Sequence, residues 1–176
     1  MKKILLTILP LLLIVGCSST HFSRIVNEYD EFNKTRNIYQ KDNWVMKNNF
    51  TGGEGVELNL FLIKKDNQSD LYLKFRLSSS EWLFIRENDS FKFLFTDGEV
   101  LTLSPHGSVN TDVLEGGHIK EWGVIKLDSV ILKQLLNKEL KSFRVIGKDY
   151  YSDYNTNLDM VQKNWEEFSE LHLVNY

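Results

Sequence analysis

Residues that could carry nucleophilic catalysis are few in this chain of 176 residues. Such catalysis needs a serine or cysteine activated by a base that a third group orients. The only cysteine is Cys17, and no Gly-x-Ser-x-Gly sequence is present. His106 lies in a Pro-His-Gly turn and His118 follows two glycines, so we expect both in solvent-exposed loops. We therefore predict no catalytic residue, with a serine–histidine–acid site assembled in space as the alternative.

Two patterns of polar residues match metal sites only in part. His118 and Glu121 are three residues apart, a spacing that directs side chains to opposite faces of a strand. Oxygen-bearing side chains alternate over residues 153–159 as at the start of a calcium loop, but Leu158 occupies the position of the turn glycine. An asparagine-rich turn into a capped helix explains that run equally well. We therefore predict no metal and no cofactor.

Aromatic side chains give the main indication of a binding surface. The candidate residues are Trp122, on a predicted strand, and the cluster of Tyr150, Tyr151 and Tyr154, which stands among aspartates. An exposed aromatic group flanked by acids can hold a peptide, a glycan or a protein partner. The alternative is internal packing, in which helices cover one sheet face and the N-terminal segment covers the other.

Three further side chains are expected to serve the fold. We predict that Trp82 and Trp165 anchor the hydrophobic core. Arg144 stands between two apolar residues of a predicted strand, and we expect it to pair with an acid such as Asp30.

The first seventeen residues have the features of an export signal. Two lysines precede an almost wholly apolar stretch at residues 4–15, which is too short for a spanning helix of about twenty residues. The sequence Ile14-Val15-Gly16-Cys17 resembles the lipobox of bacterial lipoproteins. That resemblance implies cleavage between Gly16 and Cys17, diacylation of Cys17 and attachment of the new N-terminus to a membrane. An ordinary secretory signal beside a free cysteine is the alternative.

The rest of the sequence agrees with an exported lipoprotein. A single cysteine cannot form an intramolecular disulfide. Each acyl chain contributes about 0.8 kcal/mol per buried methylene, so several chains anchor a protein stably. Ser18, which follows the cysteine, favours the outer membrane and the periplasmic side in a bacterium with two membranes. We predict a signal peptide at 1–16, a lipidated tether at 17–27 and a single domain at 28–176.

The charge balance argues against a nucleic-acid partner. The net charge is −3, and it becomes −5 when Lys2 and Lys3 are removed with the signal, which leaves 19 basic against 24 acidic residues. Nucleic-acid binding requires a cationic surface. The content of 42% hydrophobic and 26% charged residues is that of a folded globular protein.

Period-two alternation dominates the centre of the chain and predicts strands. The expected strands lie at 56–62, 71–77, 82–86, 91–95, 99–103, 119–127 and 142–147, with a weaker one near 35–39 and a tight turn at Asp97-Gly98. Two helices follow: Asp128 can cap the first, and Thr156 with Asp159 has the spacing of a capping box before the second. This order predicts an α+β fold, with an antiparallel sheet and two C-terminal helices packed on one face.

Several motifs together resemble an uncharacterised domain of bacterial exported proteins. They are Asp30-Glu31-Phe32 near Thr35, the block Glu81-Trp82-Leu83-Phe84-Ile85, Asp97-Gly98, Glu121-Trp122, the pair Arg144 and Gly147, and Asp149-Tyr150-Tyr151. The similarity covers roughly residues 28–172, with Glu81 where an aspartate usually precedes the tryptophan. It implies a shared fold and no particular activity.

These observations lead to three functional hypotheses. The first is a non-catalytic envelope lipoprotein that binds or shields an envelope protein or glycan. The second is a periplasmic inhibitor or immunity-type lipoprotein that inserts residues 104–118 or 148–155 into an enzyme cleft. The third is a hydrolase of envelope polymers, which would need a deep pocket that joins His106 or His118 to a carboxylate.

Overall fold

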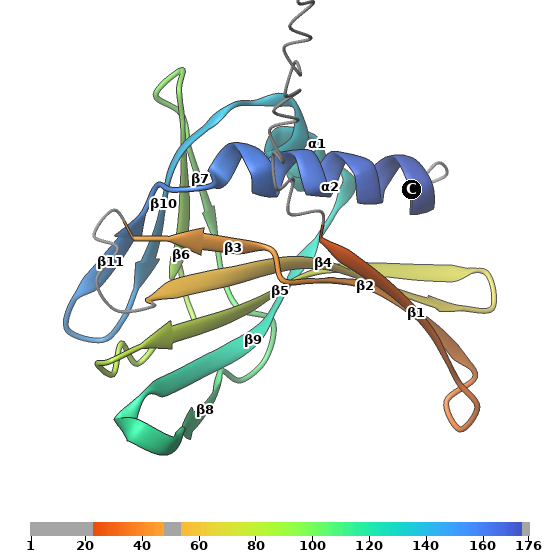
Figure 1. The fold of residues 1–176 in the computed structure, drawn as a ribbon. Coiled ribbons are helices and arrows are strands. Elements are labelled where there is room, and N and C mark those ends of the chain that lie inside the picture. Colours follow the sequence, from red (N-terminus) through yellow and green to blue (C-terminus); the bar gives the residue numbers. More distant parts are fainter. Residues whose placement is uncertain (1–22, 48–53, 174–176) are drawn as a thin grey trace, which may run out of the picture.

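The computed structural model describes residues 23–47 and 54–173, which form mostly antiparallel β-sheet together with two helices (Figure 1). The strands are β1 (Arg24–Asp30), β2 (Thr35–Lys41), β3 (Trp44–Met46), β4 (Gly55–Lys65), β5 (Gln68–Ser79), β6 (Phe91–Phe95), β7 (Val100–Leu103), β8 (Asn110–Val113), β9 (Ile119–Leu127), β10 (Leu140–Ile146) and β11 (Tyr151–Tyr154). The helices are α1 (Ser129–Asn137) and α2 (Leu158–His172). In the described part of the chain, neither helix is long and apolar enough to cross a membrane.

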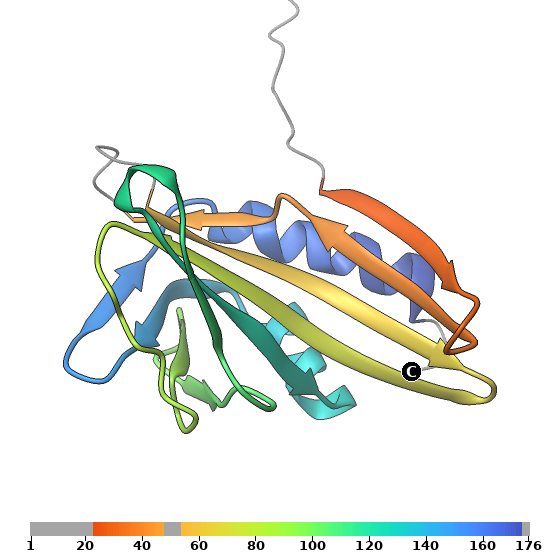
Figure 2. The ribbon, with the colours of Figure 1, turned by 90° about the horizontal axis from the view of Figure 1, so that it is seen from below.

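The strands form two antiparallel sheets, whereas the sequence predicted one. The large sheet has seven strands in the order β1-β2-β4-β5-β9-β8, with β3 also paired to β4. The small sheet has four strands in the order β11-β10-β6-β7. The small sheet and the helices lie on the same side of the large sheet, and in Figures 1 and 2 no helix covers its opposite face. We call these the core face and the outer face of the large sheet.

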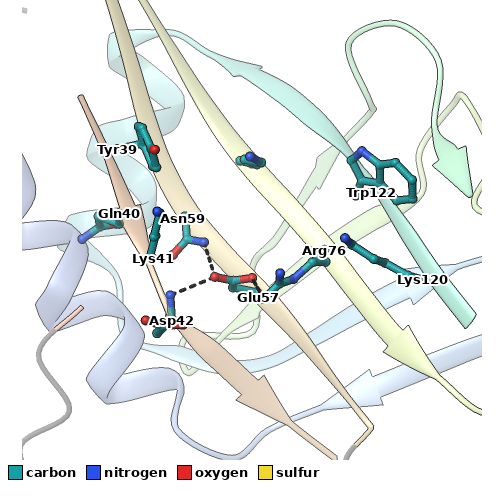
Figure 3. Close-up of a pocket in the computed structure, with 10 residues that line it drawn as sticks. Tyr39, Gln40, Lys41, Asp42, Glu57, Asn59, Arg76, Lys120 and Trp122 are labelled. Atoms are coloured by element: carbon teal, nitrogen blue, oxygen red, sulfur yellow. Dashed lines mark hydrogen bonds and ion pairs between the residues drawn. The ribbon is translucent and has the colours of Figure 1, made fainter. Parts of the chain in front are cut away.

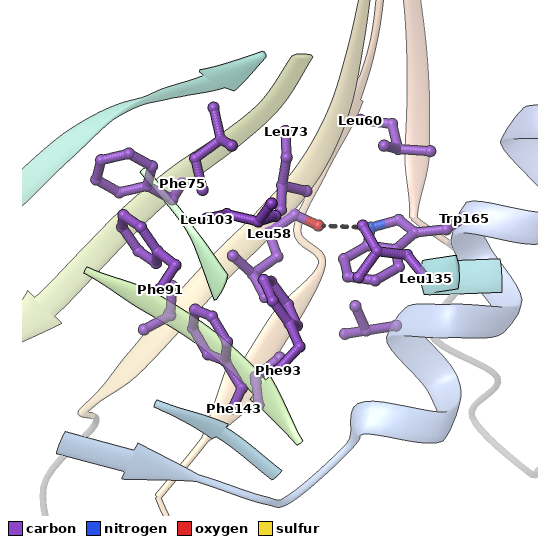
Figure 4. Close-up of a cluster of buried hydrophobic side chains, with 14 of the residues drawn as sticks. Leu58, Leu60, Leu73, Phe75, Phe91, Phe93, Leu103, Leu135, Phe143 and Trp165 are labelled. Atoms are coloured by element: carbon purple, nitrogen blue, oxygen red, sulfur yellow. Dashed lines mark hydrogen bonds between the residues drawn. The ribbon is translucent and has the colours of Figure 1, made fainter. Parts of the chain in front are cut away.

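Aromatic side chains fill the space between the two sheets (Figure 4). The ring centroids of Phe75 on β5 and Phe91 on β6 are 4.5 Å apart, and those of Phe93 and Phe143 are 4.6 Å apart. Trp165 of α2 is completely buried, and its indole Nε1 donates a hydrogen bond to the Leu58 carbonyl at 3.0 Å. The prediction that Trp165 anchors the core is confirmed, and the alternation of β4, β5 and β6 places their apolar residues in this core.

Buried amides fix α2 against the first strands. The Asn164 side chain donates to Asn43 Oδ1 at 2.8 Å, and the Asn164 carbonyl accepts from Gln40 Nε2 at 2.6 Å. Asn43 in turn donates to the Leu58 carbonyl at 3.0 Å. Because each of these buried groups has a partner, the network sets the position of the helix as well as adding to its stability.

The two helices begin in different ways. Asp128 caps α1 as predicted, since its Oδ1 accepts from the backbone N–H groups of Val130 and Ile131 at 2.9 and 2.8 Å. For α2 the residue at the N-cap is Asn157, one position after the Thr156 that the sequence predicted. Asn157 precedes that helix in the left-handed conformation without a side-chain cap, and Thr156 forms a β-bridge with Met46 instead.

The strand predicted at 82–86 is also wrong, because Glu121 replaces a neighbouring strand as the partner of this segment. Leu83 and Ile85 are buried, and their N–H groups donate to the two carboxylate oxygens of Glu121, each at 3.0 Å. Phe84 lies between them with a left-handed φ of 54°. Trp82 is 38% exposed and stacks on Phe84 at 5.2 Å between ring centroids, so it does not anchor the core.

The N-terminal segment extends the large sheet instead of covering it. β1 begins at Arg24, so residues 24–27, which were assigned to the tether, are part of the sheet. β1 pairs along its whole length with β2, from Arg24 opposite Lys41 to Asp30 opposite Thr35. The expectation that this segment covers the second sheet face is therefore wrong for the described residues, and the outer face needs another explanation for its aromatic side chains.

Gly147 allows the 82–86 segment to approach β10. A Cβ atom at position 147 would lie 1.8 Å from the Leu83 carbonyl oxygen. That oxygen also accepts a hydrogen bond from the Lys148 N–H at 3.0 Å, and the Leu83 N–H is held by Glu121. These hydrogen bonds prevent the segment from moving away to make room for a larger side chain at position 147.

We expect Gly147→Ala to lower the free energy of unfolding by about 2–3 kcal/mol, because it overpacks a site whose neighbour is backbone. Urea unfolding followed by tryptophan fluorescence measures this change. Lys148→Ala is the matched control, since it keeps the same backbone contacts and alters only an exposed side chain. A Gly147→Ala variant as stable as the control would contradict the steric argument.

Candidate binding site

A depression of about 360 Å³ lies on the outer face of the large sheet (Figure 3). Strand alternation directs alternate side chains of β2, β4, β5 and β9 to this face, and Gln40 and Asp42 complete the lining of the depression. The lining residues are Tyr39, Gln40, Lys41, Asp42, Glu57, Asn59, Lys74, Arg76, Lys120 and Trp122. We call this depression the groove.

The groove is positively charged in a chain whose net charge is −3. Its cationic residues are Lys41, Lys74, Arg76 and Lys120, against the two acids Asp42 and Glu57. Among the described residues none of the three lysines forms an ion pair, while Arg76 pairs with Glu57. Charge is therefore segregated on this protein, and the groove favours anions.

Glu57 is the buried centre of the groove and is only 6% exposed. Its Oε1 accepts hydrogen bonds from the Asp42 N–H and from Asn59 Nδ2, both at 2.8 Å, and its Oε2 forms the ion pair with Arg76. Arg76 and Glu57 lie directly opposite each other on β5 and β4. Because both oxygens of Glu57 are engaged, this carboxylate holds Asp42, Asn59 and Arg76 in their places around the groove.

Two buried polar atoms of the groove lack a hydrogen-bond partner among the described residues: Asn59 Oδ1 and Arg76 Nε. Asn59 is 5% exposed, and its Nδ2 is already committed to Glu57, which fixes the orientation of the amide. The guanidinium group of Arg76 lies 5.1 Å from the centroid of the Trp44 ring. The groove thus holds one unused acceptor and one unused donor on adjacent strands, which is unusual in a folded protein.

A row of aromatic rings continues the groove along the sheet. The centroids of Tyr39 and Phe61 are 6.0 Å apart, those of Phe61 and Tyr72 are 6.2 Å apart, and those of Tyr72 and His106 are 5.9 Å apart. A second depression of about 400 Å³ lies beside this row and shares Tyr39, Lys41 and Lys74 with the groove. Aromatic and cationic side chains therefore alternate over a surface longer than the groove itself.

The structure separates the four aromatic residues that the sequence brought together. Trp122 lines the groove, where the Lys120 ammonium group lies 4.9 Å from its ring centroid. Tyr150 and Tyr151 lie on the small sheet side, and both are exposed. The Tyr150 hydroxyl donates to the Trp82 carbonyl, and the Arg144 guanidinium lies 3.8 Å from the Tyr151 ring centroid.

Tyr154 does not belong to any exposed surface. It is 1% exposed, because the alternation of β11 directs Ser152 and Tyr154 inward and Tyr151 outward. Burial raises the pKa of the Tyr154 hydroxyl well above its usual value. The prediction that Tyr154 contributes to a binding surface is therefore wrong.

The prediction that Arg144 pairs with an acid is confirmed, but Asp30 is not that acid. Arg144 pairs with Asp153, which faces it across β10 and β11, with N–O distances of 2.6 and 2.8 Å. Asp30 instead closes its own turn by accepting from the N–H groups of Phe32 and Asn33. Hydrogen bonds from Asn33 lower the pKa of the Asp30 carboxyl below its usual value. Asp30 is thus held by hydrogen bonds within its own turn, and Arg144 pairs with the residue directly opposite it on the neighbouring strand.

The remaining predicted residues take no part in the groove. Gly16 and Cys17 lie outside the described residues. His106 and His118 are exposed loop residues, as expected, and neither lines the groove. Within residues 23–47 and 54–173, no group of three or more histidine, cysteine, aspartate or glutamate side chains is arranged to hold a metal ion.

Replacing Glu57 with glutamine tests the ordering role of this residue. Glu57 is the buried member of an ion pair whose other member, Arg76, is 38% exposed. Its replacement leaves the guanidinium group only partly compensated by solvent, so we expect Glu57→Gln to lower the free energy of unfolding by about 2 kcal/mol. Asp70→Asn is the matched control, because Asp70 pairs with Lys126 at 2.8 Å on the same face but is half exposed. The control is expected to cost less than about 0.5 kcal/mol. Equal losses in the two variants would contradict the special role of Glu57.

Comparison of the chain with protein-family models, with curated protein sequences and with solved structures gave no match.

Proposed function

We propose that this protein is a lipid-anchored component of the bacterial cell envelope with a non-catalytic binding role, and that the groove is its binding site for an anionic ligand. The observation that carries the proposal is the convergence of four cationic side chains in a groove of a chain with net charge −3. Unpaired lysines on a surface repel one another, so an anion that settles among them gains attraction from each.

We also propose that the described residues act as one domain with both helices packed on the core face of the large sheet. One buried cluster includes side chains from both sheets and both helices, which supports a single cooperative unit. Such a unit presents the groove as a rigid surface, because the strands that carry it are also the strands that carry the core.

The proposed anchor would hold the groove close to the membrane. Lipidation at Cys17 leaves six residues before β1 begins at Arg24. A fully extended chain of this length spans at most roughly 25 Å. In a bacterium with two membranes, Ser18 supports a place on the periplasmic side of the outer membrane, where the groove would meet envelope components and no nucleic acid.

An inhibitor or immunity-type lipoprotein is the second candidate, because the structure presents a fixed pair of exposed aromatic rings. Trp82 and Phe84 stack on each other and are 38% and 51% exposed. Glu121 accepts hydrogen bonds from the backbone of this segment, and the Tyr150 hydroxyl donates one to the Trp82 carbonyl. Rigid exposed tryptophan and tyrosine side chains are typical of protein-binding hot spots.

The anchor is tested by replacing Cys17 with alanine. We expect the wild-type chain to incorporate labelled palmitate and to fractionate with membranes, and the Cys17→Ala variant to do neither, because no other cysteine can accept the lipid. Metabolic labelling and cell fractionation measure both properties. Ser18→Ala is the control and should remain lipidated. A Cys17→Ala variant that is processed and fractionates like the wild type would disprove the anchor.

The groove is tested by reversing a single charge. Lys74 is exposed and forms no ion pair among the described residues, so Lys74→Glu should leave the fold intact. We expect it to weaken binding to dextran sulfate by about tenfold, measured by titration calorimetry with neutral dextran as the blank. Lys133→Glu on the exposed side of α1 changes the net charge equally and should alter the affinity less than about twofold. Equal effects of the two substitutions would mean that binding depends on net charge and not on the groove.

A further inference from the structure

We propose that the groove binds an acidic glycan, meaning a chain of sugar rings that carry carboxylate or phosphate groups. This inference rests on the proposed function, in which the groove takes an anion. It adds the nature of the molecule that bears the charge, and three properties of the groove point to it.

The first property is the unused pair of buried polar atoms. Asn59 Oδ1 can only accept a hydrogen bond, and Arg76 Nε can only donate one. Both atoms have almost no accessible surface, so a ligand reaches them only after neighbouring side chains shift. It must then bring a donor to Asn59 and an acceptor to Arg76 on the adjacent strand. A hydroxyl group does both at once, whereas a fully ionised carboxylate or phosphate oxygen offers no donor to Asn59. The centre of the groove therefore matches a hydroxylated ligand better than a simple anion.

The second property is the separation of charge from this polar centre. Lys120 lies beside Trp122 on β9, and Lys41 lies on the side toward Tyr39 (Figure 3). Lys74 lines the second depression together with Tyr39 and Lys41. Lysines on both sides of a centre in which Glu57 and Arg76 offset each other's charge suit a ligand whose charges are spaced along it. A sugar chain with one acid group on each ring or on alternate rings has that spacing, while a single inorganic ion does not.

The third property is the length and the aromatic character of the surface. Tyr39 and Trp122 stand at the two ends of the groove, and the Tyr39–Phe61–Tyr72 row leads into the second depression. Aromatic rings provide flat apolar surface, on which the C–H faces of sugar rings can pack while their hydroxyls remain free for hydrogen bonding. Two depressions that share three residues fit a ligand of several units.

Single-stranded nucleic acid is the main competitor, since it too combines phosphates with rings that stack on aromatic side chains. The net charge of −3 and the export signal both disfavour it. Single-stranded DNA also lacks a sugar hydroxyl on each unit, which the Asn59 and Arg76 pair would use, although RNA carries one. We therefore commit to the glycan and treat nucleic acid as an outcome of the test.

The test is calorimetric titration of the full-length lipidated chain in detergent with a set of defined probes. Oligogalacturonate carries a carboxylate on every ring, and its methyl ester has the same rings without charge. A phosphodiester-linked sugar polymer supplies the phosphate version, and inorganic phosphate and galacturonic acid supply the charge without the chain. Oligo(dT) represents nucleic acid. We expect one of the two acidic polymers to bind at least tenfold more tightly than the methyl ester and than either monomeric anion, and the polymer that binds identifies the acid group.

Two substitutions connect this binding to the groove. We expect Tyr39→Leu and Trp122→Leu each to weaken binding of the acidic polymer by at least fivefold while changing the affinity for inorganic phosphate less than twofold. Tyr29→Leu is the matched control, because Tyr29 is 60% exposed on β1 outside the groove. Thermal unfolding of each variant shows that the fold is retained, and Trp122→Leu alone carries the test if Tyr39→Leu unfolds early.

The outcomes separate the two proposals. If Lys74→Glu changes the binding of no anionic probe, the proposed function fails and the glycan fails with it. If anions bind in a manner that depends on Lys74 but the acidic polymers bind no more tightly than inorganic phosphate, or the aromatic substitutions have no effect, the glycan alone is overturned. Tighter binding of oligo(dT) than of both sugar polymers, with the same dependence on Trp122, would also overturn it in favour of nucleic acid.

Discussion

Strand β4 is buried on both of its faces, and this constraint shapes the rest of the molecule. Val56, Leu58 and Leu60 point into the core and have no exposed surface, while Glu57 and Asn59 on the other face are 6% and 5% exposed. An unpaired carboxylate at such a position would cost several kcal/mol. Arg76 on the adjacent strand and the Asp42 N–H offset that cost. The outer-face residues of β4 thus belong to the charged groove, while the core-face residues of the same strand build the core.

A second buried glutamate, Glu121, is stabilised by backbone hydrogen bonds instead of a cation. Glu121 is 1% exposed and forms no ion pair with any residue that the structure describes. It accepts hydrogen bonds from two backbone N–H groups of the segment that carries Trp82 and Phe84. That segment includes Phe84 in the left-handed conformation, which costs about 1–2 kcal/mol for a residue other than glycine. The carboxylate and the close contact at Gly147 hold the strained backbone in place. One glutamate therefore orders a cation at the groove, and the other orders an aromatic pair at the edge of the large sheet.

The sequence predicts the strands well where alternation and burial coincide. The patterns at 56–62, 71–77 and 91–95 lie within β4, β5 and β6, and the Asp128 cap of α1 is confirmed. The pattern at 82–86 gave a wrong prediction, because Leu83 and Ile85 are buried on either side of Phe84 although the segment is a loop. Its backbone partner is the Glu121 side chain from β9 and not a neighbouring strand. Lys74 and Arg76 are visible as polar members of their strand, but their neighbours are not. Lys41, Asn59 and Trp122 lie beside Lys74 and Arg76 because of the order of the strands in the sheet. That order depends on long-range contacts, which no local sequence pattern encodes.

The position of α2 at the end of the chain limits the order in which the protein can fold. The helix covers the core face of β4 through Trp165, and it contacts Gln40 and Asn43 through Asn164, across 124 and 121 residues of chain. Until α2 is synthesised, the apolar side chains of β4 lack their cover, so no N-terminal portion can complete a core as the chain leaves the ribosome. The core is then complete only when α2 has been synthesised. A chain with this delay keeps its apolar strands uncovered for longer, and the unfolded state is the one in which a chain can pass through a narrow membrane channel, as the proposed export would require.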